Sequence, residues 1–350
     1  MRLLFDVLGS PRESGGMRQH ATQVVRTWAA EYPGDELIVL GPEWVGDDLD
    51  DVNISHVRWA NERVIARASG QFVASSLLSR QHRVDALVSL SPIVSPFLRR
   101  TPTVCFQHDW RHLKNPQEFG LAQKLYRKFW ASSAEWASLT ICISDKTAME
   151  TRGVAPGSNI VVIENGRDHA TSWERIEKPN DGIRRIVTFG HHNNKRPELV
   201  IEALPHVSAS RVELTVLGAS GSYREELSAL ARAAGVESAV RFPGFVSDGE
   251  YRGVMQRADV VVMASSDEGF GLPIVEAETL GIPAVVTSDS GMADIHDNVI
   301  VASPTPASLG AAVGQALVQQ GVVGERGMYR WVDMVHQLRT HISEYVDAVL

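Results

Sequence analysis

The sequence predicts an α/β protein built from two Rossmann-like halves. Short runs rich in Val, Ile and Leu alternate with longer stretches of helical periodicity, which is typical of parallel sheets covered by helices on both faces. The alternation stops at one polar stretch near the middle of the chain and then resumes. The 350 residues, 44% of them hydrophobic, are enough for two cores, because domains cluster at roughly 100 to 200 residues.

The expected strands follow the apolar runs in order. In the first half they cover residues 3–7, 37–40, 54–57, 86–89, 103–106, 139–143 and 161–163. In the second half they cover residues 186–189, 213–217, 240–242, 260–263 and 284–287, with helices near 196–205, 222–234, 248–257 and 272–280. Ligands of such sheets bind beyond the carboxyl ends of the strands, so we expect the functional residues there.

The polar stretch at residues 166–182 contains few strand-forming residues and divides the chain. We therefore expect an N-terminal domain, a linker, a second domain and a C-terminal helix that packs back towards the N-terminal domain. Their expected bounds are residues 1–168, 169–182, 183–325 and 326–350.

Composition limits the possible partners. The net charge of −8 argues against a nucleic-acid partner. No window approaches the roughly 18 apolar residues of a membrane span, and residues 1–10 do not resemble a signal peptide, so a cytoplasmic protein is expected.

Cys105 and Cys142 each lie inside an apolar run and are expected to be buried, reduced thiols. The acidic run at residues 47–51 contains a DxD pattern but is interpreted as a solvated loop, not a metal site.

One segment of the second half carries a specific chemical pattern. After the strand at residues 260–263, residues 268–276 read EGFGLPIVE. The two glycines let a ligand approach the backbone, Pro273 suits the first turn of a helix, and the free amides at that helix start attract phosphate. Glu268 precedes the helix and Glu276 lies within it, so both can face one ligand. Two surface glutamates would explain either residue alone but not the whole run.

A second segment, residues 190–197, follows the strand at 186–189 and reads GHHNNKRP. Lys195 and Arg196 can stabilise the charge that grows on two phosphates as a nucleoside diphosphate departs. A solvated helix start is the alternative, but cations at a helix N-terminus oppose the helix dipole. His191 and His192 have no Cys or carboxylate at ligand spacing, so we expect them to line a phosphate pocket and predict no metal.

The first half offers His108 and Asp109, which follow the strand at residues 103–106. A single histidine is more often structural, but its place at a strand's carboxyl end favours a functional role. Gly15 and Gly16 open a helix after the first strand, and Ser144 follows the strand at residues 139–143.

The EGFGLPIVE run resembles the E-x7-E signature of the retaining GT-B glycosyltransferases of family 4, and the resemblance extends over roughly residues 14–335. It implies a GT-B fold with two Rossmann-like domains facing across a cleft. It also implies that Glu268 contacts the transferred sugar and that Glu276 binds the ribose. The backbone amides that would hold sugar hydroxyls and phosphate are those of Phe270, Gly271 and Leu272.

The other segments resemble landmarks of the same family. Lys195 and Arg196 look like its basic pair with the order reversed, next to Gly190 in the donor site. His108 with Asp109 looks like the HD element of the mannosyltransferase branch, in which the histidine meets the donor sugar. By the same resemblance Gly15 and Gly16 approach the donor phosphate, whereas Asp109 and Ser144 lie on the acceptor side.

The resemblance implies retaining transfer of a hexose from a nucleotide-diphosphate sugar to a saccharide or lipid-linked saccharide, by a front-face reaction that needs no metal and no cofactor besides the donor. GDP-mannose is the favoured donor, with dTDP-rhamnose or a UDP-hexose as alternatives. An inactive GT-B-like scaffold subunit is the alternative from another class, and an epimerase or a phosphorylase-like enzyme is disfavoured by the E-x7-E run.

Residues 124–136 mix basic and aromatic side chains on an expected helix. One interpretation is peripheral contact with the inner face of the plasma membrane, where a lipid-linked acceptor would lie. The other is an ordinary helix that packs its aromatic residues on the sheet.

Overall fold

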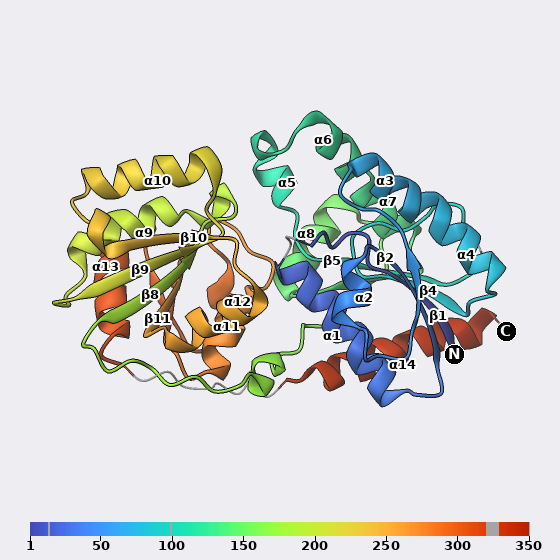
Figure 1. The fold of residues 1–350 in the computed structure, drawn as a ribbon. Helices are drawn as coiled ribbons and strands as arrows, with labels where there is room; N and C mark the ends of the chain where they lie inside the picture. The colour runs from blue at the N-terminus through green and yellow to red at the C-terminus, as the bar shows by residue number, and fades with distance from the viewer. Residues whose placement is uncertain (13–14, 99, 320–328, 350) are drawn as a thin grey trace. The chain divides into compact units, whose positions relative to one another are not determined.

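The computed structural model describes residues 1–12, 15–98, 100–319 and 329–349, and the chain forms two compact units. Unit 1 comprises Met1–Gly166 and Arg330–Leu350, and unit 2 comprises Arg167–Tyr329. Figure 1 shows that each unit is a parallel sheet with helices on both faces. The residues expected as a linker, 169–182, are part of unit 2, where Ile176 N donates to Gln256 Oε1 at 3.0 Å.

The described part of unit 1 contains a seven-stranded sheet in the order β3-β2-β1-β4-β5-β6-β7. Its strands are β1 (Arg2–Asp6), β2 (Glu36–Gly41), β3 (Ser55–Arg58), β4 (Ala86–Ser89), β5 (Thr103–Gln107), β6 (Leu139–Cys142) and β7 (Ile160–Val162). All seven expected strands are confirmed to within one residue at each end. β1 pairs with both β2 and β4, so the order of the strands reverses at β1.

Helices cover both faces of this sheet. They are α1 (Gly15–Glu31), α2 (Trp44–Asp48), α3 (Val64–Ser69), a π-helix (Gly70–Ala74), α4 (Ser75–Gln81), α5 (Arg111–Lys114), a 3-10 turn (Pro116–Glu118), α6 (Leu121–Arg127), α7 (Phe129–Trp136), α8 (Asp145–Val154) and α14 (Trp331–Val349). α14 packs on α1, and Arg339 Nε lies 3.2 Å from Asp35 Oδ2, just beyond the end of α1. The last helix of the chain is therefore part of the core of unit 1.

Unit 1 contains both cysteines and the acidic run at residues 47–51. Cys105 and Cys142 are buried free thiols, as expected, and burial raises the pKa of Cys105 to about 12. The acidic run was expected to be a solvated loop, but α2 contains part of it. Arg18 of α1 binds Asp48 through two N–H groups at 2.7 Å each. Because α1 supplies cations, this acidic run is largely neutralised within the protein.

Unit 2 contains a parallel sheet in the order β10-β9-β8-β11-β12-β13. Its strands are β8 (Arg184–Phe189), β9 (Val212–Leu217), β10 (Val240–Gly244), β11 (Val260–Met263), β12 (Ala284–Thr287) and β13 (Val299–Ala302). β13 was not expected, because it is a short, half-exposed edge strand that follows a polar run. β8 pairs with both β9 and β11, which makes the gap between β8 and β11 the switch point of this sheet.

The helices of unit 2 are α9 (Pro197–Ala203), α10 (Gly221–Ala233), α11 (Asp248–Arg257), α12 (Leu272–Thr279) and α13 (Pro306–Ala316), with 3-10 turns at His169–Ser172, Asn193–Lys195, Leu204–His206, Glu237–Ala239 and Met292–Asp294. Alternate residues of β11 face opposite sides of the sheet. Val260 and Val262 pack with α9, α10 and α13, whereas Val261 and Met263 pack with α11 and α12. Both faces of the sheet are therefore buried.

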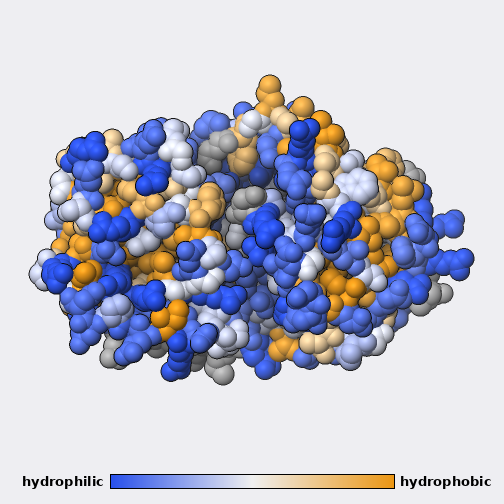
Figure 2. Space-filling view, viewed as in Figure 1, coloured by the Kyte–Doolittle hydropathy of each residue, from blue (hydrophilic) through white to orange (hydrophobic). Residues whose placement is uncertain are grey.

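The surface is mixed, and Figure 2 shows hydrophobic residues gathered on unit 1 above α6 and along α3 and α4. None of the described helices is long and apolar enough to cross a membrane.

Candidate functional site

The two segments that the sequence predicts to bind the donor lie side by side at the switch point of the unit 2 sheet. Lys195 follows β8 and Glu268 follows β11, and these two strands are neighbours. Asn194 joins the segments, because its Nδ2 donates to Asp267 O at 3.1 Å and its carbonyl accepts from Ser266 N at 2.9 Å. The side chain of Asn194 is buried. The fold therefore fixes the loop after β8 against the loop after β11.

Lys195 and Glu268 form an ion pair between these loops. Lys195 Nζ lies 2.5 Å from Glu268 Oε1, and the two side chains are 11% and 13% exposed. The backbone amide of Glu268 donates to Ser290 O at 3.0 Å, which anchors the loop on its other side. An ammonium group has three N–H donors, so Lys195 can hold Glu268 and a phosphate oxygen at the same time.

Arg196 is engaged differently from its neighbour. Its Nε donates to Ala264 O at 2.5 Å, and its Nη2 donates to Ser265 O at 3.1 Å and Thr287 Oγ1 at 3.0 Å. Both Nη atoms bind Asp289, at 2.7 and 2.8 Å. The guanidinium thus joins the ends of β11 and β12. The negative charge beside the Arg196 guanidinium is thus the Asp289 carboxylate. The sequence predicted a bound phosphate in that position.

The glycine loop after β11 is constrained by its surroundings. Gly271 has a φ of 86°, and a Cβ there would lie 2.9 Å from Met292 Sδ, so only glycine fits without strain. Gly271 is also the N-cap of α12, which begins with Leu272 and Pro273. At Gly190 a Cβ would lie 2.9 Å from Val216 Cγ1, so packing also favours glycine there, and the place of Gly190 in the donor site stays a prediction.

A buried polar cluster supports this loop from below. His296 Nε2 donates to Phe270 O at 2.7 Å, and its Nδ1 lies 3.3 Å from Arg167 Nη1. The Arg167 guanidinium lies 5.0 Å from the centre of the Phe270 ring and 3.7 Å from Glu278 Oε2. Arg167, Glu278 and His296 are each at most 6% exposed. Contacts to the carbonyl and to the ring of Phe270 therefore hold this residue in place.

Glu276 lies within α12 and is also buried. Its Oε1 lies 3.0 Å from His169 Nε2, and its Oε2 accepts a hydrogen bond from the Tyr251 hydroxyl. Burial and the negative charge of Glu276 raise the pKa of Tyr251 well above its usual value, which keeps the hydroxyl a donor. Sequence reasoning identified Glu276 but neither of its partners, and no local pattern connects residues so far apart in the chain.

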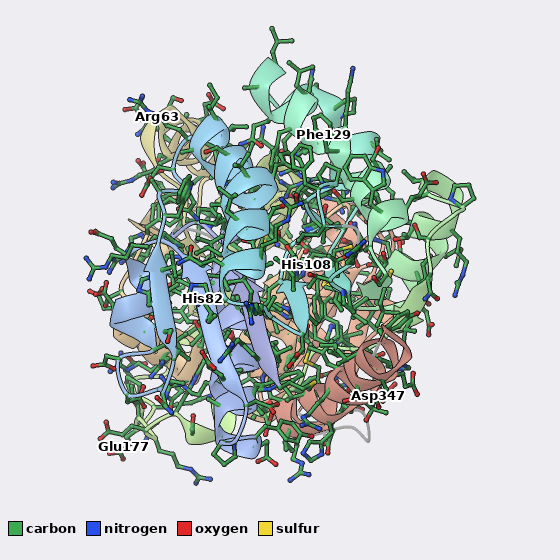
Figure 3. The ribbon with its side chains drawn as sticks, turned by 90° about the vertical axis from the view of Figure 1, so that its right-hand side faces the viewer. Arg63, His82, His108, Phe129, Glu177 and Asp347 are labelled. Atoms are coloured by element: carbon green, nitrogen blue, oxygen red, sulfur yellow. The ribbon has the colours of Figure 1, made fainter. Side chains whose placement is uncertain are left out.

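In unit 1, His108 lies just beyond β5, where Figure 3 labels it. Its Nε2 donates to Leu90 O at 3.2 Å, and burial lowers its pKa, so the ring is uncharged at neutral pH. His20 of α1, which the sequence did not single out, packs edge-on against it with ring centres 4.9 Å apart. His20 Nδ1 lies 2.8 Å from Asn165 Oδ1. These contacts fix the orientation of the His108 ring.

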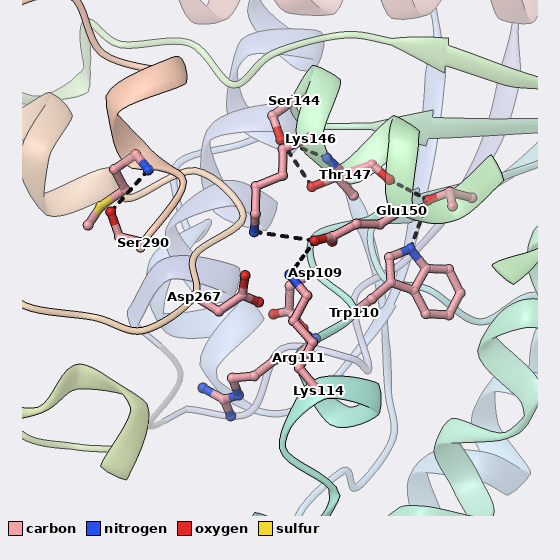
Figure 4. Close-up of polar contacts among 12 residues, drawn as sticks. Asp109, Trp110, Arg111, Lys114, Ser144, Lys146, Thr147, Glu150, Asp267 and Ser290 are labelled. Atoms are coloured by element: carbon pink, nitrogen blue, oxygen red, sulfur yellow. Dashed lines mark hydrogen bonds and ion pairs between the residues drawn. The ribbon is translucent and has the colours of Figure 1, made fainter. Parts of the chain in front are cut away.

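Asp109 opens a charged region that Figure 4 shows in close-up. Asp109 Oδ1 accepts from Arg111 N at 3.0 Å. Burial would raise the pKa of Asp109, but the charges of Arg111 and Arg127 outweigh it and hold that pKa below the usual value. Nearby, Lys114 Nζ lies 2.5 Å from Glu150 Oε1, so the region around Asp109 contains charges of both signs.

The remaining predicted residues of unit 1 lie at helix starts. Ser144 is the N-cap of α8, because its Oγ accepts from Thr147 N at 3.2 Å. Gly15 and Gly16 begin α1, and no described atom lies within 4 Å of a Cβ placed at Gly15. Packing within the described chain therefore does not explain Gly15, and its role near the donor phosphate stays a prediction. So does the acceptor-side role of Ser144.

Metal binding was not expected, and no cluster of three or more His, Cys, Asp or Glu residues in the described parts of the chain could hold a metal ion. His191 and His192 pack against each other with ring centres 4.8 Å apart. Their predicted place in the phosphate pocket stays a prediction.

Two family models match adjoining parts of the chain. Residues 14–171 match the model described as Glycosyltransferase Family 4, and residues 171–322 match Glycosyl transferases group 1.

D-inositol 3-phosphate glycosyltransferase of Corynebacterium jeikeium is 28% identical over 199 residues, which are 53% of this chain and 48% of that protein. GDP-mannose:cellobiosyl-diphosphopolyprenol alpha-mannosyltransferase of Komagataeibacter xylinus is 31% identical over 139 residues, 39% of this chain and 35% of that protein. The chain thus spans half or less of the length of these relatives.

A solved structure extends the likeness in fold to the whole chain. The Anabaena protein HepE in complex with UDP and glucose superposes with a TM-score of 0.75 at 18% identity, over 98% of this chain and all of that one. The predicted GT-B fold, with two parallel Rossmann-like sheets, is therefore confirmed. Together with the two matching models, this shows that the chain belongs to family 4 of the glycosyltransferases, the group 1 family of GT-B fold.

Proposed function

We propose that this protein is a retaining glycosyltransferase that moves a hexose from a nucleotide-diphosphate sugar to a saccharide or lipid-linked saccharide acceptor. The observation that supports this most is the Lys195–Glu268 ion pair at the switch point of the unit 2 sheet, beside the glycine loop. A sheet of this type binds its ligand at that point. The pair offers a cation for the diphosphate and a carboxylate for the sugar within one small site.

Each group in the site has a distinct proposed role. The Lys195 ammonium stabilises the negative charge that grows on the leaving diphosphate, and the amides of Phe270, Gly271 and Leu272 bind phosphate and sugar hydroxyls. Glu268 contacts the transferred sugar near its reacting carbon. Glu276, held by Tyr251 and His169, accepts hydrogen bonds from the ribose hydroxyls.

The proposed reaction is a front-face substitution. The acceptor oxygen bonds to the anomeric carbon on the face from which the diphosphate leaves, the bond from that carbon to the diphosphate oxygen breaks, and the β-phosphate takes the acceptor proton. His108 contacts the transferred sugar in this proposal. Its uncharged ring suits a hydrogen bond to a hydroxyl better than an ion pair with phosphate.

The donor is proposed to be GDP-mannose. The resemblance of His108 with Asp109 to the mannosyltransferase element supports it, and the Komagataeibacter relative is named as an enzyme of GDP-mannose. The name of the Corynebacterium relative does not state a donor, and the HepE structure contains UDP and glucose. A UDP-hexose is therefore the nearest alternative, followed by dTDP-rhamnose.

The test is release of nucleoside diphosphate from a panel of GDP-, UDP- and dTDP-sugars by the full chain. GDP-mannose is expected to give the fastest release, and activity with dTDP-rhamnose alone would overturn the proposed donor. Glu268→Ala, Lys195→Ala and His108→Ala are each expected to lose turnover while staying folded. Arg224→Ala changes an exposed cation of α10 and serves as the control. A folded wild type that uses no donor would instead favour the inactive scaffold.

A further inference from the structure

Unit 1 exposes large apolar side chains on two helical segments. One segment runs from α3 through the π-helix to α4, and the other comprises α6 and α7. The exposed apolar residues of these segments include Ile65, Val73, Leu77, Leu121, Leu125 and Phe129. Ile65 and Leu121 are each 82% exposed. Spacings of four and eight residues place the members of each set on one side of their helix.

The two segments form one surface. The rings of Phe72 and Phe129 meet edge-on with centres 5.3 Å apart. Beneath them, the Tyr126 hydroxyl donates to Gln71 Oε1 at 2.5 Å, and both side chains are buried. Figure 3 labels Phe129 on α7, and Figure 2 shows the hydrophobic residues gathered over α6 and along α3 and α4. The inward-facing residues thus pack on each other and leave the apolar set facing outward.

Phe97 extends this surface. It is 56% exposed, and its carbonyl accepts from Arg80 Nη2 at 2.8 Å, which ties its loop to α4. We call Phe97 and the six apolar residues above, with the exposed cations among them, the amphiphilic surface.

The charge of the amphiphilic surface is opposite to that of the whole chain. Residues 63–83 contain four basic and no acidic side chains, and α6 and α7 together (residues 121–136) contain three basic side chains and one acidic side chain, Glu135. At the average acidic content of the chain, 42 in 350, these 37 residues would hold about four carboxylates. Arg63, Arg80, Lys124 and Lys128 are all exposed. The chain therefore combines a net charge of −8 with a surface that is apolar and predominantly cationic.

We propose that the amphiphilic surface docks on an anionic lipid bilayer. Exposed leucine and phenylalanine flanked by lysine and arginine, on helices that lie along a surface, suit the boundary between headgroups and acyl chains. The core of a protein–protein interface is depleted in lysine, whereas here Lys124 and Lys128 lie among the apolar residues. For its link to a lipid-linked acceptor the inference rests on the proposed function, but docking itself needs no donor.

The test is binding of the full chain, without donor, to vesicles of phosphatidylcholine alone or with about one third phosphatidylglycerol. The wild type is expected to sediment with the anionic vesicles and to bind at least about tenfold more weakly to the neutral ones, or in about 0.5 M salt. The double variants Leu121→Gln/Leu125→Gln and Lys124→Gln/Lys128→Gln should each weaken binding about tenfold.

Two controls match these changes. Val318→Gln removes an apolar side chain of unit 2 that is 83% exposed, and Arg224→Gln removes an exposed cation of α10. Both should bind like the wild type. Release of nucleoside diphosphate in solution should be unchanged in all four variants, so lost binding with retained release separates this inference from failure of the proposed function.

Wild type that does not bind anionic vesicles, or that binds neutral ones equally well, would overturn the inference. So would double variants that bind as the wild type does. Sedimentation velocity covers the remaining alternative: a wild-type dimer that Leu121→Gln/Leu125→Gln converts to monomer, with no vesicle binding, would show an interface between two copies of the chain.

Discussion

Two adjacent cations at the start of α9 provide the sharpest test of the site. Lys195 Nζ contacts Glu268, whereas Arg196 donates to Ala264 O, Ser265 O and Thr287 Oγ1 and binds Asp289 with both Nη atoms. We predict that Lys195→Gln abolishes turnover but costs little stability. Arg196→Lys should lower the stability of the fold but leave turnover largely intact.

The magnitudes follow from the contacts. A lysine has three N–H donors on one nitrogen and cannot reproduce the fork of Arg196, so about two of its acceptors lose their partner. At about 1 kcal/mol for each net hydrogen bond, Arg196→Lys should lower the free energy of unfolding by about 2 kcal/mol. Lys195→Gln leaves an uncharged polar group on a side chain that is one atom shorter, so its loss of stability should stay below about 1 kcal/mol. The same substitution removes the cation proposed to stabilise the leaving diphosphate, so kcat should fall about 100-fold or more.

The assay combines urea unfolding of both variants with release of nucleoside diphosphate from the preferred donor. Turnover of Arg196→Lys is compared at a temperature where the variant is fully folded. Wild-type stability together with abolished turnover in Arg196→Lys would refute the reasoning, because Arg196 would then be a phosphate ligand. Full activity in Lys195→Gln would refute the role of the ion pair.

Three further predictions concern stability and donor binding. Burial raises the pKa of Asp6 from 3.8 to about 7, so the folded state keeps a proton that the unfolded chain releases, and stability falls as pH rises from about 4 to 7. Asp6→Asn should therefore match the wild type near pH 4 and gain about 4 kcal/mol by pH 8 in urea unfolding; an equal difference at both pH values would contradict this. A Cβ at Gly166 would lie 2.2 Å from Trp331 N, so Gly166→Ala should lose more than about 2 kcal/mol, while Gly15→Ala should unfold like the wild type. Tyr251→Phe removes the hydroxyl that holds Glu276 and should raise the KM for the donor about tenfold with a smaller change in kcat; an unchanged KM would exclude that positioning role.

The parallel sheets could be predicted from the sequence because their strands are buried on both faces and read as continuous apolar runs. β11 and β12, for example, match the expected residues 260–263 and 284–287. β13 has one exposed and two half-buried residues, and such an edge strand has no distinct pattern. The stretch at residues 169–182 lacked strand character and was interpreted as a linker. Gln256 and Ala258 of unit 2 nevertheless bind its backbone and side chains, contacts that no local pattern records.

Candidate site residues could be identified from the sequence only where polar residues lie in the loop after a predicted strand. Glu268 and Lys195 stand at strand ends that the sheet order brings together, so their pairing follows once β8 and β11 are neighbours. The partners of Glu276 come from elsewhere in the fold. Tyr251 lies on α11 and His169 in the expected linker, and only tertiary packing brings them to α12. The contact of Arg196 with Asp289 could not be predicted for the same reason, since Asp289 follows a different strand, and the role of Arg196 towards phosphate stays a prediction.

Recognition of a diphosphate in unit 2 has to depend on directed N–H groups and not on overall charge. Residues 169–350 contain 15 basic and 23 acidic side chains, so this half of the chain is itself acidic. Within the site, Glu268 offsets the charge of Lys195 and Asp289 offsets that of Arg196. What remains for an incoming phosphate is the further N–H donors of the Lys195 ammonium and the backbone amides at the start of α12. Such donors act only over hydrogen-bond distances, so the proposed recognition of a diphosphate needs no net positive charge and is compatible with the net charge of −8.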